Sequence, residues 1–219
     1  GLSRLTLGTA QIGLNYGIAN RLGKPSLQDA FEMLDTAWEG GITSMDTAAS
    51  YGNAEVILGK YFTGKEEAAK KLQPLPFIIT KWHAKDSGRY QSTEAVLKEL
   101  VEIMRRSIER LNITSIPCMM LHSPFLLKFH GRAVIQQLRT FVKQGLIGRA
   151  GISLAAYTDQ EFDELWPYIQ DDIFEMIQIP INVFDHRLLN NGALNQMRLA
   201  GKKILARSVY LQGLFFLDE

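Results

Sequence analysis

Short apolar runs alternate with helical patterns along the whole chain. Each run has five or six residues that are mostly apolar at both odd and even positions, as is typical of parallel strands covered on both faces. We therefore expect seven strands, at residues 5–9, 42–46, 77–81, 117–122, 149–153, 175–179 and 203–208.

The segments between these runs carry signals of helices. Ser26 and Asp29 have the spacing of a capping box, and the apolar pattern that follows ends at the glycine pair 40–41. The longest helix is predicted over 93–111, where apolar residues form one stripe and charged residues the opposite face. Further helices are expected to begin at Thr158 and to cover residues 133–144 and 192–200.

Strands that alternate with helices predict either an open doubly wound sheet or a (β/α)8 TIM barrel. A dinucleotide-binding open sheet should carry Gly-x-Gly-x-x-Gly after its first strand, and this spacing does not occur. The barrel is favoured, although the pattern lacks an eighth strand and the last helices. We expect one α/β barrel domain over residues 1–219 that is incomplete at its C-terminal end, so that the full chain continues beyond Glu219.

Composition excludes several classes of protein. Lys plus Arg number 24 and Asp plus Glu 23, so a net charge of +1 gives no basic excess for a nucleic acid. The single cysteine, Cys118, excludes an internal disulfide framework and fits a reducing compartment. No apolar run reaches the ~20 residues that span a bilayer, and the first residues do not form a signal peptide. We expect a cytoplasmic protein, favoured as a monomer, without membrane or nucleic-acid partners.

Four reactive side chains fall at or just after the ends of predicted strands, where TIM barrels place their active sites. Asp46, Lys81 and His122 each end an apolar run, and Tyr51 follows Asp46 by five residues. Each has an ordinary alternative, such as a loop anchor, a loop aromatic, a solvated strand end or a turn residue. The occurrence of all four at these positions favours a site.

The chain resembles the aldo-keto reductase superfamily in the stretches 41–55, 79–81 and 121–124, with support from 7–11 and 148–153. These stretches contain Asp-x4-Tyr-Gly, Thr-Lys and His-x-Pro in the order of the family. The resemblance implies a TIM barrel that binds NAD(P)H and reduces an aldehyde or ketone, with NADP(H) expected over NAD(H).

The resemblance also implies roles for the four residues. Tyr51 would donate a proton to the substrate oxygen, and the Lys81 ammonium would lower the pKa of the Tyr51 phenol below its ordinary value near ~10. Asp46 would pair with Lys81 and keep it charged. His122 would donate a hydrogen bond to the substrate oxygen. The histidines His83, His130 and His186 show no metal-ligand spacing, and we expect no metal site.

The family places a Ser-Asn pair after the fifth strand and a glutamine in the sixth, which hold the nicotinamide carboxamide. Ser153 and Gln178 match, but Leu154 stands where asparagine is usual. After the seventh strand, Arg207 replaces the tyrosine that stacks on the nicotinamide; its guanidinium could stack likewise, or form only a salt bridge at the barrel mouth. The remaining residues expected near the pyrophosphate are Ser208, Tyr210 and Gln212.

Two rival functions remain open. A non-catalytic subunit could keep the barrel and sense the nicotinamide nucleotide without turnover, although such a protein has no need for all four reactive residues. Another barrel enzyme, such as a lyase or isomerase, would call for a metal cluster or a Schiff-base lysine deep in a strand, and the sequence shows neither.

Overall fold

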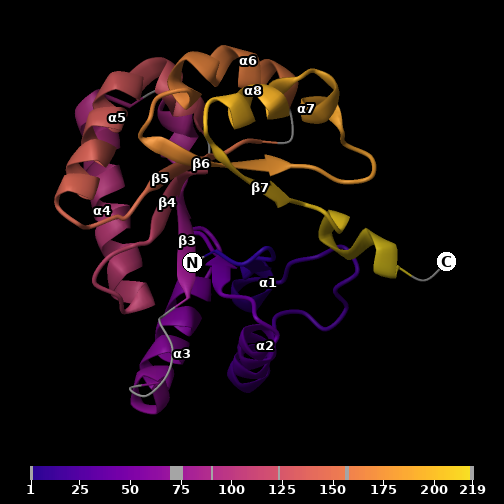
Figure 1. The fold of residues 1–219 in the computed structure, drawn as a ribbon. Helices are drawn as coiled ribbons and strands as arrows, with labels where there is room; N and C mark the ends of the chain where they lie inside the picture. The colour runs from indigo at the N-terminus through magenta and orange to yellow at the C-terminus, as the bar shows by residue number, and fades with distance from the viewer. Residues whose placement is uncertain (1, 70–75, 90, 123, 156–157, 218–219) are drawn as a thin grey trace.

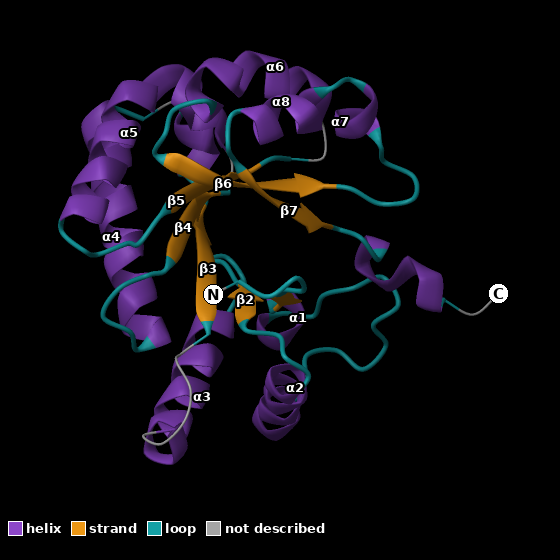
Figure 2. Cartoon of the chain, viewed as in Figure 1, coloured by secondary structure: helices purple, strands orange, loops and turns teal. Residues whose placement is uncertain are grey.

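Seven parallel strands form one curved sheet in a computed structural model, which describes residues 2–69, 76–89, 91–122, 124–155 and 158–217 (Figures 1 and 2). The strands follow one another in sequence order across the sheet. All seven predicted strands are confirmed, with ends that move by up to two residues. Their bounds are β1 (Leu7–Gly8), β2 (Ser44–Asp46), β3 (Phe77–Trp82), β4 (Cys118–Leu121), β5 (Ala150–Ser153), β6 (Phe174–Pro180) and β7 (Lys203–Arg207).

Helices cover the outer face of this sheet (Figure 2). The α-helices are α1 (Ala10–Gly13), α2 (Leu27–Glu39), α3 (Ala54–Ala69), α4 (Thr93–Leu111), α5 (Leu127–Lys143), α6 (Thr158–Ile169), α7 (Arg187–Asn190) and α8 (Ala193–Leu199). Three short 3-10 helices are η1 (Lys85–Gly88), η2 (Pro124–Leu126) and η3 (Leu211–Phe216). No described helix combines the length and apolarity needed to cross a membrane.

The ends of α2 and α4 follow from local sequence. Ser26 caps α2 through the backbone N–H of Asp29, and the Asp29 carboxylate accepts from the Ser26 backbone, which confirms the predicted capping box. Ser92 caps α4, and Asn112 ends it in the left-handed conformation. The prediction of a helix over 93–111 is therefore confirmed at both ends.

The sequence analysis predicts no helix between the second and third strands, and the structure has α3 there, although two glycines, Gly59 and Gly64, weaken its helical pattern. Gly59 has a packing reason. A Cβ atom at this position would lie 2.1 Å from the carbonyl oxygen of Arg110, near the end of α4. Only glycine allows α3 and α4 to approach this closely.

Alternate residues of each strand pack on opposite faces of the sheet. In β4, Met119 and Leu121 join the large apolar core beneath the outer helices, whereas Cys118 and Met120 join a small cluster with Ile79. This second cluster fills the concave interior of the sheet. Burial on both faces explains why the strand sequences are apolar at both odd and even positions.

The sheet is an incomplete TIM barrel, in which β1 and β7 remain at the two edges. Loops bridge this opening on one side: the backbone N–H of Ile18, in the connection between α1 and α2, donates to the carbonyl oxygen of Gln212 in η3 at 2.8 Å. Figure 1 shows this connection reaching toward η3. Within the described residues, the predicted fold class and the lack of an eighth strand are both confirmed.

Candidate active site

The structure brings together the four candidates Asp46, Tyr51, Lys81 and His122 at the carboxyl ends of β2, β3 and β4. The Lys81 Nζ atom lies 2.7 Å from Oδ1 of Asp46 and 5.1 Å from the centre of the Tyr51 ring. The rings of Tyr51 and His122 meet edge to face, with centres 5.8 Å apart. The phenol, the ammonium and the imidazole therefore form one cluster.

Lys81 is buried inside the sheet, and its ammonium depends on two acceptors. Besides Asp46, the backbone carbonyl of Thr47 accepts a hydrogen bond from Nζ at 2.8 Å. Burial lowers the pKa of Lys81, and the charge and hydrogen bond of Asp46 act in the opposite direction. The expected pairing of Asp46 with Lys81 is present.

The expected fall in the pKa of Tyr51 is wrong for this structure. Burial, followed by the negative charge of Asp46, raises the pKa of Tyr51 to about 12. The positive charge of Arg207, rather than that of Lys81, is the influence that opposes this rise. Because Asp46 neutralises Lys81 at 2.7 Å, the ion pair offers the phenol little net positive charge.

His122 is neutral at physiological pH. Burial lowers the pKa of His122 to about 3, and electrostatic repulsion from Lys81, His83 and Arg207 acts in the same direction. Its backbone N–H donates to the carbonyl of Trp82 at 2.7 Å, which fixes the residue next to β3. The neighbouring residue 123, part of the stretch 121–124 that resembles the family, lies outside the described residues.

Two of the proposed cofactor residues form a hydrogen-bonded chain with Asp46. Ser153 and Gln178 are paired in register between β5 and β6, and Ser153 Oγ donates to Oε1 of Gln178 at 2.8 Å. Gln178 Nε2 in turn donates to Oδ1 of Asp46 at 3.1 Å. The two residues therefore lie at the same end of the sheet as the four candidates.

Arg207 ends β7 and reaches toward β5. One guanidinium nitrogen donates to the carbonyl of Leu154 at 2.6 Å, and another donates to Ser208 Oγ at 3.0 Å. Its Nε atom is buried and has no hydrogen-bond partner among the described residues. No described carboxylate forms an ion pair with Arg207, so the salt-bridge alternative finds no support in this part of the chain.

The other two expected cofactor residues lie farther along the chain, at η3. Tyr210 is 66% exposed, and the backbone carbonyl of Gln212 accepts a hydrogen bond from the backbone N–H of Ile18. Among the described residues, no hydrogen bond or ion pair joins the side chain of Tyr210 or Gln212 to the Asp46–Lys81 pair.

Two residues at this site were missed by the sequence analysis. The His83 ring meets the His122 ring edge to face, with centres 6.3 Å apart. The alternation of side chains along a strand could have predicted the position of His83. Lys81 lies on the inner face of the sheet and Trp82 in the outer core, so the following residue is expected on the inner face again. Tyr16 is the second: burial raises its pKa, and the nearby Tyr51 adds to this effect.

The sequence model of the Aldo/keto reductase family matches residues 4–217, nearly the whole chain. The chain belongs to the aldo/keto reductase family. No curated protein matches the sequence.

Solved structures show the same fold. A putative aldo-keto reductase from Pseudomonas aeruginosa matches 94% of this chain and 73% of its own, with a TM-score of 0.72 and 22% identity. An aldo-keto reductase from Bacillus halodurans, in its holo form, matches 97% and 64%, with a TM-score of 0.69 and 20% identity. Glycerol dehydrogenase from Gluconobacter oxydans matches 97% and 62%, with a TM-score of 0.66 and 22% identity. This aldo/keto reductase chain thus spans 62–73% of the length of these relatives.

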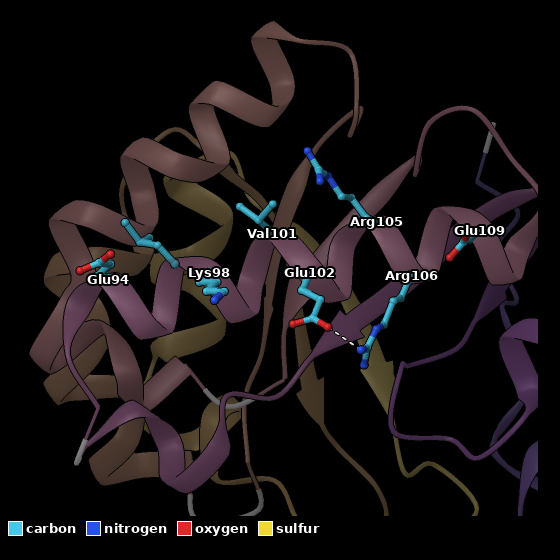
Figure 3. A pocket seen from close by; sticks show the side chains of 8 residues that line it. Glu94, Lys98, Val101, Glu102, Arg105, Arg106 and Glu109 are labelled. Carbon is cyan, nitrogen blue, oxygen red and sulfur yellow. Dashed lines mark hydrogen bonds and ion pairs between the residues drawn. The ribbon is translucent and has the colours of Figure 1, made fainter.

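A surface groove elsewhere on this aldo/keto reductase is a weaker candidate for its site. It follows the outer side of α4, where the aliphatic parts of Leu97 and Val101 lie between charged residues, and Glu102 pairs with Arg106 (Figure 3). All of its lining residues come from this one helix, and none belongs to the four candidates. Among the described residues, no three histidine, cysteine or carboxylate side chains could hold a metal ion.

Proposed function

We propose that this aldo/keto reductase reduces an aldehyde or ketone with NAD(P)H at the cluster of Asp46, Tyr51, Lys81 and His122. The observation that carries the proposal is the contact of a phenol, a buried ammonium and a neutral imidazole at the carboxyl ends of neighbouring strands. Reduction places negative charge on the carbonyl oxygen, so a proton donor and a hydrogen-bond donor are needed at one point.

Tyr51 supplies the proton. Because its pKa is raised to about 12, the hydroxyl remains protonated at neutral pH and is available to the substrate oxygen. Lys81 lies against the face of the same ring and holds it in place, and the positive charge of Arg207, which opposes the rise in the pKa of Tyr51, would stabilise the negative charge that grows on the phenol oxygen as the proton leaves. Asp46 and the Thr47 carbonyl hold Lys81 in this position.

His122 binds the substrate oxygen. A pKa lowered to about 3 keeps the imidazole neutral, so one ring nitrogen carries a proton that it can donate and the other does not. A neutral ring orients the carbonyl without delivering a second proton. The neighbouring His83 ring lies on the same side and would form part of the substrate pocket.

The residues present fit a nicotinamide cofactor. A carboxamide both donates and accepts hydrogen bonds, and the Gln178 amide and Ser153 hydroxyl offer both functions. The buried Nε of Arg207 provides a further donor without a described partner, near Leu154, where the family's asparagine is absent. Ser208, Tyr210 and Gln212 are proposed to lie toward the pyrophosphate, and NADP(H) is proposed over NAD(H). When bound, the reduced nicotinamide supplies the hydride.

The test is a spectroscopic assay of the purified chain. Loss of nicotinamide absorbance is followed with a panel of aldehydes and ketones, using NADPH and NADH in parallel, and binding is measured by quenching of protein fluorescence. We expect binding and turnover with at least one carbonyl. Tight binding without turnover across the panel would support the nucleotide-sensing alternative instead, and absence of both would contradict the proposal.

A further inference from the structure

Gln178 connects two sides of the concave sheet. It lies on β6, yet its amide nitrogen is 3.1 Å from Oδ1 of Asp46 on β2. The side chain is almost fully buried, with 3% of the residue exposed. A buried amide that spans the interior to reach one carboxylate oxygen restricts where that carboxylate can lie.

The direction of each hydrogen bond in this network follows from chemistry. An ionised carboxylate only accepts, so the Gln178 group that faces Asp46 must be the NH2 end. Its carbonyl end then faces Ser153, whose hydroxyl donates to it. The Asp46 carboxylate alone thus sets which end of the amide faces it, and the bond from Ser153 is a second contact at the opposite end.

Among the described residues, the Asp46 carboxylate meets two side chains through one oxygen. Oδ1 accepts from Gln178 Nε2 and from Lys81 Nζ, and Lys81 gives another hydrogen to the Thr47 carbonyl. The Asp46 side chain is 15% exposed, whereas the Lys81 side chain is fully buried. The carboxylate at the edge of the site therefore needs an anchor if it is to stay on the buried ammonium.

We propose that Gln178 is a positioning residue that holds the Asp46 carboxylate against Lys81. This role goes beyond binding of a nicotinamide carboxamide, and it exists in the cofactor-free chain. It rests on the proposed function only for its consequence on turnover, because the position of the Lys81 ammonium is a structural property.

The experiment observes the Lys81 ammonium directly by NMR in the cofactor-free chain, with the signal assigned by its loss in Lys81→Met. Gln178→Met keeps the length of the side chain but removes both amide groups. Gln178→Asn keeps the amide but is one methylene shorter and tests the reach. In both variants we expect hydrogen exchange of the ammonium to become at least about fivefold faster, because the unanchored carboxylate leaves Lys81 more often.

Ser153→Ala is the matched control. It removes the other hydrogen bond of the Gln178 amide but leaves the bond to Asp46, so exchange at Lys81 should stay within about twofold of the original chain. Unchanged exchange in whichever Gln178 variants fold would overturn the proposal. An equal rise in Ser153→Ala would also overturn it, since that result reports general loosening of the network.

A kinetic measurement adds the functional consequence. At saturating cofactor, Gln178→Met should lower kcat by about tenfold more than Ser153→Ala does, because both variants weaken the proposed carboxamide contacts and only the former releases Asp46. If the unmodified chain reduces no carbonyl, that result counts against the proposed function. The ammonium exchange would still decide the role of Gln178.

Discussion

Gly13 and Gly52 meet at a contact that leaves no space for a side chain on either residue. A Cβ atom on Gly52 would lie 2.4 Å from the carbonyl oxygen of Gly13, and one on Gly13 would lie 1.9 Å from the carbonyl oxygen of Tyr51. Gly52 also has a positive φ of 56°, a conformation that residues with a side chain rarely adopt. The end of α1 is thus packed directly against the turn that carries the proposed proton donor.

Gly52→Ala should therefore displace Tyr51 as well as destabilise the fold. We expect a loss of about 2 kcal/mol in stability from the left-handed conformation and the collision together, and at least a tenfold fall in kcat. Thermal melts and steady-state kinetics measure the two effects. Gly64→Ala is the control, because Gly64 lies in α3 with open space around its Cβ position. An active, fully stable Gly52→Ala would show that the contact does not position Tyr51.

Tyr51→Phe removes the proposed acid and keeps the ring that packs beside Lys81 and His122. General acid catalysis typically contributes 10²–10⁴-fold, so kcat should fall by at least about 100-fold. Binding of the reduced cofactor, followed by fluorescence, should change by less than about threefold. Tyr61→Phe is the matched control: its hydroxyl donates to Asp35 at 2.7 Å, and its loss should affect the melt rather than turnover. Turnover retained in Tyr51→Phe would assign the proton to another group.

Lys81→Met and Asp46→Asn test whether the ion pair acts as one unit. Without Asp46, burial lowers the pKa of Lys81 unopposed by its nearest negative charge, so the lysine loses its proton more readily. Either substitution should then abolish the same contribution to kcat, and the double variant should resemble Lys81→Met. The measurement is a double-mutant cycle on kcat over a range of pH. Costs that simply add in the double variant would contradict a shared role.

The lowered pKa of His122 predicts a loss of stability in acid. Between its value of about 3 in the fold and about 6.5 in the unfolded chain, the unfolded state binds a proton that the native state does not. Stability therefore rises with pH through this window and is fully present above about 6.5. When the pH falls from 7 to 5, the free energy of unfolding of His122→Asn should therefore decrease by about 2 kcal/mol less than that of the original chain. Denaturant melts of both chains over this range of pH measure the difference, and an unchanged slope in His122→Asn would contradict the prediction.

Arg207→Met tests the proposed cofactor contact. Arg207 is anchored to Leu154 and Ser208 and has a buried Nε without a described partner. Its loss should weaken binding of the reduced cofactor by at least about tenfold, read by fluorescence titration. Arg149→Met is the control, because Arg149 pairs with Glu175, a partly exposed residue of β6. Equal effects of both substitutions would mean that only overall charge matters.

The inner strands β3 to β6 could be predicted because both of their faces are buried. Residues such as Met119 and Met120 face different cores, so each strand appears in the sequence as a short apolar run. Where packing overrides local propensity, prediction fails: α3 contains Gly59 because the end of α4 lies against it, a contact between segments far apart in the chain.

The grouping of the four site residues could also be predicted, because parallel strands place their carboxyl ends together. The direction of the pKa shift of Tyr51 could not be predicted, because it depends on burial and on how fully Asp46 cancels the charge of Lys81. The link from Gln178 to Asp46 was equally inaccessible, because it depends on the curvature that brings β6 opposite β2.

The hydrogen bond from Ile18 to Gln212 joins the first and last parts of the described chain. The connection between α1 and α2, which carries Tyr16, can form this hydrogen bond only after β7 and η3 have been synthesised. Contacts of such long sequence separation carry a high loop-closure cost and tend to form late in folding. During synthesis, this contact near Tyr51 can therefore form only after Gln212 has been made, well after the chain has acquired its four reactive residues.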